Sequence, residues 1–386
     1  MLAATVLCYF TLYGPQPLLP FFRERYALTT AGAGLIVTVA MLPLTLGPVL
    51  AGLVLSVVNP RRLMGVGLLV LSVAIGVFVV AIRYETLLAA RLVQGLMFPL
   101  ILTAVTAQIA MTSASGTVGR RLGYYVAATI VGGFGGRMLA SASAAMGDWR
   151  FFFAGVAVCA LVLGALNVGT GDAMTRSPGR PIAQPARSSG SAPVRVFASV
   201  FLLFFVFSGT LNVLPFRTLN IATASGEWLS GVVYAGYVMG IVTSIWSHRV
   251  VAIAGGRARA LAIAFLLMVF SIALMLFTSV AMLFAALFVF CGAMFLIHSV
   301  STGVVNERSA GREGAANGLY ISSYYSGGVL GSYAAPLVYD AFEWSALVAL
   351  SIVLVAIGGL LSVSAASGST ARRRRTISDT IPGSPP

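Results

Sequence analysis

The chain has 386 residues, of which 59% are hydrophobic and only 9% charged, and its formal net charge is +14. Soluble domains carry roughly a quarter charged residues, because much of a folded protein's surface faces water. The composition therefore excludes an ordinary soluble protein and indicates an integral membrane protein.

Apolar stretches of about 20 residues, enough to cross a bilayer core, occur in two sets of six. The first set lies at 2–22, 31–57, 63–82, 86–111, 120–145 and 149–168. The second set lies at 196–216, 228–247, 258–277, 280–302, 316–339 and 344–364. The runs are continuous rather than alternating with period two, so they predict helices and not a β-barrel. The predicted fold class is an all-α membrane protein with 12 transmembrane helices.

The two sets are copies of one unit, because residues match at a constant offset of 195 positions. Pro20-Phe21 recurs as Pro215-Phe216, Gly132-Gly133 as Gly327-Gly328, and Asp148-Trp149 as Glu343-Trp344. Membrane proteins built from two such repeats are typically transporters, with a pathway between the copies. We expect an N-terminal six-helix bundle at 1–168, a flexible cytoplasmic linker at 169–195, a C-terminal bundle at 196–365 and a disordered basic cytoplasmic tail at 366–386.

The basic residues, all of them arginines, segregate by loop. Seventeen lie in segments on the side of the N-terminus, and five lie in loops on the other side. This positive-inside pattern predicts a multi-pass protein of the plasma (inner) membrane with both termini in the cytoplasm. The positive net charge is therefore attributed to cytoplasmic arginines that face anionic membrane lipid, and not to binding of nucleic acid.

The fifth helix of each predicted bundle carries two parallel stripes. Small residues at Gly132 and Gly136, repeated as Gly327 and Gly331, would allow close helix packing. The neighbouring stripe holds Tyr125 and Arg137, and its repeat holds Tyr320 and Tyr324. Polar side chains within a span are expected to face protein or a water-filled cavity, although both stripes would also suit a plain packing surface.

Few other ionisable groups lie inside the predicted spans. Arg91 and Gln94 share one face of the fourth helix, and His298 lies in the tenth. No Asp or Glu lies within a span; Glu24, near the outer end of the first helix, is a candidate partner for Arg91 or Arg137. His298 suits a proton relay or a structural hydrogen bond equally well.

Prolines mark the outer parts of two helices. Pro15, Pro17 and Pro20 in the first helix, and Pro215 in the seventh, are expected to break regular helix and free backbone carbonyls near the outer mouth. Catalytic motifs and a P-loop are missing from the sequence, so we predict a non-enzyme that needs no cofactor and is not driven directly by ATP.

At this point the chain resembles a known family. The helix-four run Arg91-Leu92-Val93-Gln94-Gly95 resembles motif B of the major facilitator superfamily, and Gly132-Gly133-Phe134-Gly135-Gly136-Arg137 is similar to its antiporter motif C. The run from Tyr13 to Pro20, and Gly318-Leu319-Tyr320 with Tyr324-Tyr325, resemble the YnfM-type inner-membrane transporters of its drug-efflux-like branch. The resemblance covers essentially the whole chain and implies two six-helix bundles that rock about a central site.

The chain departs from the family pattern in the loop after helix two. Ser56 and Val57 stand where the family has an Asp-Arg pair that helps to latch the cytoplasmic side, and Arg61 and Arg62 remain as basic residues of that gating loop. Motif C has Gly132 in place of its proline. Gating is therefore expected to depend on other contacts.

The sequence thus predicts a monomeric secondary transporter that moves a small molecule by alternating access, with efflux in exchange for protons implied by the resemblance. The predicted cavity residues are Tyr13, Gln16, Arg91, Gln94, Tyr125, Arg137, Asn212, His298, Tyr320 and Tyr324, and the coupling candidates are Glu24 and His298. An organic-anion carrier that uses Arg91 and Arg137, and a non-transporting receptor on the same scaffold, are the alternatives.

Overall fold

The structure is a computed structural model that describes residues 1–47, 58–113, 117–169, 191–221, 229, 231–309 and 312–378. Within these ranges all regular secondary structure is helical. Seven of the described helices are long and apolar enough to cross a membrane. The predicted all-α fold class is confirmed, and the predicted 12-helix arrangement is partly visible.

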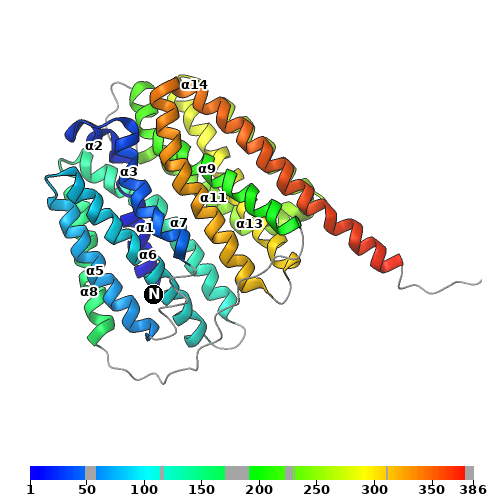
Figure 1. Ribbon diagram of the computed structural model, residues 1–386, viewed down its shortest axis with the longest axis horizontal. Helices are drawn as coiled ribbons and strands as arrows, with labels where there is room; N and C mark the ends of the chain where they lie inside the picture. The colour runs from blue at the N-terminus through cyan, green and yellow to red at the C-terminus, as the bar shows by residue number, and fades with distance from the viewer. Residues whose placement is uncertain are drawn as a thin grey trace, which may run out of the picture.

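The N-terminal half lies beside the C-terminal half, blue to green against green to red in Figure 1. Its elements are α1 (Leu2–Tyr13), η1 (Gln16–Leu18), α2 (Leu19–Arg25), α3 (Thr30–Met41), η2 (Leu42–Leu46), α5 (Pro60–Val80), α6 (Tyr84–Thr112), α7 (Val118–Ala145) and α8 (Arg150–Gly169). The elements of the C-terminal half are α9 (Ser191–Ile221), η3 (Val233–Gly236), α11 (Tyr237–Ile253), α12 (Arg257–Leu274), α13 (Val280–Arg308) and α14 (Glu313–Ser378). We call the end of the bundle with Met1 and Ile253 the inner end, and the end with Arg25 and Glu343 the outer end.

Helix α14 contains two predicted spans. Its backbone leaves helical geometry at Glu343, where φ is 64° and ψ is −176°. Figure 1 shows the two arms meeting at a sharp turn. The turn falls between the spans expected at 316–339 and 344–364.

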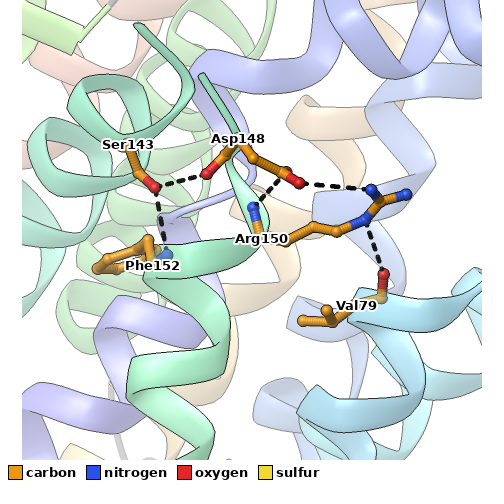
Figure 2. Close-up of polar contacts among 5 residues, drawn as sticks. All are labelled: Val79, Ser143, Asp148, Arg150 and Phe152. Atoms are coloured by element: carbon orange, nitrogen blue, oxygen red, sulfur yellow. Dashed lines mark hydrogen bonds and ion pairs between the residues drawn. The ribbon is translucent and has the colours of Figure 1, made fainter. Parts of the chain in front are cut away.

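Polar residues fix the turn between α7 and α8 at the outer end (Figure 2). The Asp148 carboxylate accepts a hydrogen bond from the backbone N–H of Arg150 at 2.9 Å and pairs with its guanidinium at 3.4 Å. Arg150 Nε donates to the Val79 carbonyl at the end of α5, at 3.3 Å. The Ser143 hydroxyl donates to the Asp148 carbonyl at 2.8 Å and accepts from the backbone N–H of Phe152. The turn is thereby tied to a third helix as well as to the two that it joins.

The glycine pairs place two helix contacts in the same register. An added Cβ at Gly136 would lie 2.8 Å from Phe10 Cα on α1, and one at Gly331 would overlap the backbone of Phe205 on α9. Phe10 and Phe205 are themselves 195 positions apart, as are Gly136 and Gly331. The α1–α7 and α9–α14 contacts are therefore copies of one backbone-to-backbone contact, of the kind that small residues permit in membranes.

One expectation needs correction in the fold: helix α9 continues through Pro215, where a break in regular helix is expected. Helix α9 begins at Ser191. Pro193 lies in its first turn, where a proline's missing N–H costs no helical hydrogen bond. Helix α14 runs to Ser378, and the domain bounds expected from the sequence stay predictions. Alanine and arginine are good helix formers, and no proline follows until Pro382.

Residues 170–190 and 379–386, and the loop positions Ser56 and Val57, lie outside the described residues. Arg61 and Arg62 are exposed at the inner end of α5, where the Asn59 side chain caps the helix by accepting from the Arg61 backbone N–H at 2.9 Å. Arg257, the repeat partner of Arg62, pairs with Glu307 and so joins α12 to α13.

Candidate functional site

A cavity of about 770 Å³ lies between the two halves. Elements α1, η2, α6 and α7 line it from one half, and α9, α11, α13 and α14 line it from the other. The lining includes Thr106 and Gly123 near the inner ends of α6 and α7, and Ser244 in the inner part of α11. The cavity therefore occupies the middle and inner part of the bundle.

The cavity wall is rich in aromatic residues, and most of the other lining residues are apolar or small. Its aromatic residues are Tyr9, Tyr13, Tyr125, Phe204, Phe207, Tyr237, Phe295, His298, Tyr324 and Tyr325. The Phe204 and Tyr324 rings stack with centroids 3.8 Å apart, and the hydroxyls of Tyr9 and Tyr325 lie 3.1 Å apart across the two halves. Among the described residues, no Asp, Glu or Arg side chain lines this wall. Such a surface suits an apolar, flat molecule that makes a few polar contacts.

Arg137 lies just beyond the outer end of the cavity and is buried, with 1% of its surface exposed. Its guanidinium carbon is 4.2 Å from the ring centroid of Tyr13, 4.9 Å from that of Tyr234 and 4.7 Å from that of Tyr237. Nε donates to the Gln16 side-chain oxygen at 2.7 Å, and Nη1 donates to the Gly133 carbonyl at 2.6 Å. The charge is thus held by aromatic faces and neutral oxygens.

Gln16 and Asn212 connect Arg137 to the other half. Gln16 Nε2 donates to Asn212 Oδ1 at 3.2 Å. Asn212 Nδ2 donates to the carbonyls of Ser332, at 2.9 Å, and Gly34, at 3.3 Å. The hydroxyls of Thr38 and Ser332 lie 2.8 Å apart. We call these side chains, Gln16, Thr38, Arg137, Asn212 and Ser332, the outer polar layer.

The outer polar layer closes the cavity on its outer side. Arg137 follows the cavity residue Gly133 by one turn of α7, and Asn212 follows Phe207 by five residues of α9, both in the outward direction. On α3, which runs inward and continues into η2, Thr38 precedes the cavity residue Leu44 of η2. All five side chains of the layer are at least nine-tenths buried.

Prolines free three of the helix carbonyls that accept hydrogen bonds from polar side chains here. A proline has no N–H, so the carbonyl four residues earlier loses its helical partner. Pro336 frees the Ser332 carbonyl, which accepts from Asn212. Pro215 frees the Leu211 carbonyl, which accepts from the Tyr234 hydroxyl at 3.0 Å, so α9 passes through its proline without a break.

Pro15 likewise frees a carbonyl of α1, that of Thr11, and Arg91 donates the hydrogen bond that this carbonyl accepts. Arg91 Nη1 donates to the freed Thr11 carbonyl and to Gln94 Oε1, both at 2.7 Å. Nη2 donates to the Leu12 carbonyl at 2.8 Å, and Nε to the Ile36 carbonyl at 2.7 Å. Gln94 in turn donates to the Ala74 carbonyl at 3.0 Å. Arg91 and Gln94 therefore join α1, α3, α5 and α6 within one half.

This placement corrects two expectations. Arg91 and Gln94 are fully buried and do not belong to the cavity lining, because their polar atoms are directed at neighbouring helices. Glu24 is exposed on α2, and both buried arginines have the neutral partners described above, so the expected ion pair with Glu24 is not formed.

His298 faces the cavity from α13. The Tyr320 hydroxyl lies 3.0 Å from His298 Nδ1 and 3.2 Å from the His298 carbonyl oxygen. The imidazole is 4.9 Å from the Tyr324 ring, centroid to centroid. Tyr320 is buried behind the lining and orients the histidine, whereas Tyr13, Tyr125 and Tyr324 lie in the wall itself.

Several cavity residues are not predicted from the sequence. Tyr9, Phe204 and Tyr237 are aromatic residues in apolar helices that hold other aromatic residues nearby, and a core position is the ordinary expectation for each. Ser332 and Thr38 of the outer polar layer are also absent from the predicted cavity residues. Ser332 carries a usable signal, because it is the repeat partner of Arg137 and lies four residues before Pro336.

Known proteins share both the sequence pattern and the fold. Residues 1–254 match the Major Facilitator Superfamily. The chain belongs to the major facilitator superfamily. It is 23% identical over 363 residues to the uncharacterised MFS-type transporter YybF of Bacillus subtilis (91% of this chain, 88% of that protein) and 24% identical over 378 residues to the inner membrane transport protein YnfM of Escherichia coli (93% and 88%).

The fold is also that of a solved transporter. The crystal structure of the nucleoside transporter NupG superposes with a TM-score of 0.73 at 12% identity, covering 94% of this chain and 98% of that one. As a member of the superfamily, the chain is a multi-pass membrane transporter. Two halves that enclose a cavity, with one end closed, are the arrangement on which such a transporter depends.

Proposed function

We propose that this chain exports a small molecule from the cytoplasm in exchange for protons, by alternating access between its two halves. The observation that carries the proposal is the cavity of about 770 Å³ between the halves, together with the outer polar layer that closes its outer side. In the proposed cycle the inner end is cytoplasmic, as the arginine distribution predicts. The structure then corresponds to the state that loads substrate from the cytoplasm.

The outer polar layer is the proposed outer gate. Its inter-half hydrogen bonds contribute about 1 kcal/mol each, and the Arg137 guanidinium also packs across the halves on the rings of Tyr234 and Tyr237. Breaking a few such bonds changes a conformational equilibrium by a few kcal/mol, which a bound ligand or proton can supply. Gln16 and Asn212 are the proposed latch between the halves.

His298 is the proposed coupling residue. It is the histidine of the cavity wall, and its neighbours there are the Tyr320 hydroxyl and the Tyr324 ring. A histidine can gain or lose a proton near neutral pH, and a wall position lets substrate and proton compete for one site. Glu24 is not favoured, because it is exposed and outside the cavity.

The alternatives differ in what the arginines do. Direct binding of an organic anion by Arg91 and Arg137 is not favoured, because neither belongs to the cavity lining. Membership of the drug-efflux-like branch remains a proposal, which the glycine-rich run of α7 supports.

The test is proton movement in proteoliposomes. Purified protein would be reconstituted with a pH-sensitive dye inside, and lipophilic cations, aromatic acids, aromatic amides and neutral sugars would be added in turn. We expect at least one compound to move protons in the opposite direction to itself, and to be accumulated against its gradient. If no compound produces protein-dependent flux, the proposal of proton-coupled export is wrong, and the receptor alternative is favoured.

A further inference from the structure

We propose that the cavity selects flat aromatic molecules that are neutral or carry one negative charge, and discriminates against aromatic cations. The inference rests on the proposed function, since it assigns the substrate class of the same cavity. It depends on the position of Arg137 behind the aromatic wall.

The rings of Tyr13 and Tyr237 separate the Arg137 guanidinium from the cavity. Tyr13 and Tyr237 line the cavity, and Arg137 does not. The guanidinium carbon lies 4.2 Å from one ring centroid and 4.7 Å from the other. A ligand stacked on the opposite face of either ring would lie about 9 Å from the charge, because the centroids of stacked rings are roughly 4.5 Å apart.

The electrostatic field of Arg137 in the cavity is positive, because no described neighbour cancels its charge. The polar partners of Arg137 among the described residues are a side-chain amide oxygen and a helix carbonyl, which carry no net charge. The described wall of the cavity adds no carboxylate. A unit charge at about 9 Å, in surroundings of effective dielectric about 20, changes the affinity of a charged ligand by more than tenfold. An anion gains this factor, and a cation loses it.

The Tyr13 and Tyr237 rings also disfavour a cationic ligand directly. A ring that already has a guanidinium on one face is a poor partner for a second cation on the other, because the two cations repel through the ring. An electron-rich or anionic aromatic ligand is free of this repulsion. The ring stack of Phe204 and Tyr324 offers an apolar surface for the rest of the molecule.

Gly133 provides a way to cancel the charge without removing the arginine. This glycine lines the cavity, and a Cβ added there would lie 3.5 Å from Arg137 Nη1 and 3.7 Å from the Tyr13 ring, both ordinary contact distances. Gly133→Asp would set a carboxylate beside the guanidinium. Gly133→Asn has almost the same shape and no charge, and is the matched control.

The experiment measures binding of three ligands of similar shape to the full chain in lipid nanodiscs by calorimetry. The probes are 2-naphthoate, 2-naphthamide and the trimethylammonium derivative of naphthalene. In the unchanged protein and in Gly133→Asn, we expect the acid or the amide to bind at least tenfold more tightly than the cation. In Gly133→Asp, this preference should disappear or reverse.

Three results would overturn the inference: equal affinity for acid and cation in the unchanged protein, no binding of any of the three probes, or identical preferences in Gly133→Asp and Gly133→Asn. If Gly133→Asp is unstable, Arg137→Gln replaces it, with loss of the preference expected. Binding with the expected preference but no flux would uphold the inference and count against transport. Flux without a preference between the acid and the cation would support transport and overturn the inference.

Discussion

The two buried arginines of this protein make a useful comparison. Arg91 and Arg137 are both at most 1% exposed, and both take neutral oxygens as partners. The partners of Arg91 all belong to the N-terminal half, whereas Arg137 reaches the C-terminal half through Gln16 and through the ring faces of Tyr234 and Tyr237. A charge tied within one half holds that half together, and a charge shared between halves is placed where alternating access must break contacts.

The largest effect is expected from Arg91→Met. The change removes four hydrogen bonds and leaves the carbonyl freed by Pro15 without a partner, at a cost of about 3 kcal/mol or more. We expect a loss of folded protein in detergent, measured by size-exclusion chromatography and thermal unfolding. Arg137→Met is the control and should remain folded. If the two variants unfold alike, the distinction between the arginines is wrong.

The repeated glycine contacts within each half give the next effect. Gly331→Ala would place a methyl group against the Phe205 backbone, and overpacking of this kind costs about 1–3 kcal/mol. The melting temperature should fall. Gly76→Ala on α5, where the added methyl group meets open space, should leave it unchanged or raise it slightly. Equal behaviour of the two variants would show that close approach at Gly331 is unimportant.

Asn212→Leu tests the contacts that Arg137 and Gln16 make between the two halves. It removes the link from Gln16 and the bonds to the Gly34 and Ser332 carbonyls, so the outer-closed state should lose about 1–3 kcal/mol relative to the outer-open one. We expect an increase of about tenfold or more in the rate at which an impermeant maleimide, added from the outer side, labels a cysteine at Ser208. Thr218→Val, which removes a hydrogen bond within α9, is the control. No increase in rate for Asn212→Leu would rule out the layer as a gate.

His298→Gln is expected to have the smallest effect on the structure, but to abolish proton-driven accumulation of substrate. One-for-one exchange with protons gives about tenfold accumulation of a neutral substrate per unit of pH gradient. The variant should lose this accumulation but still exchange labelled for unlabelled substrate at equal pH. Tyr320→Phe keeps the imidazole and should retain coupling. Full accumulation in His298→Gln would assign the proton to another group.

How far the sequence predicts this molecule depends on whether a feature is local or tertiary. Continuous apolar runs determine the helices, and a small-residue stripe determines the close contacts of Gly136 and Gly331, so these follow from the sequence. The partners of Arg91 do not, because they depend on which helix brings its freed carbonyl within reach. The sequence alone also gives no sign that Tyr13 and Tyr237 separate Arg137 from the cavity, because helix periodicity does not reveal which rings meet.

The central claim is that the outer polar layer must open for transport. Thr38 and Ser332 lie on opposite halves with hydroxyl oxygens 2.8 Å apart, close enough for a disulfide if both are replaced by cysteine. The measurement is flux in proteoliposomes of Thr38→Cys/Ser332→Cys, with Cys8, Cys159 and Cys291 replaced by serine or alanine, and each single cysteine as control. The account predicts that oxidation stops flux in the double variant alone and that reduction restores it. Undiminished flux with the disulfide formed would contradict it.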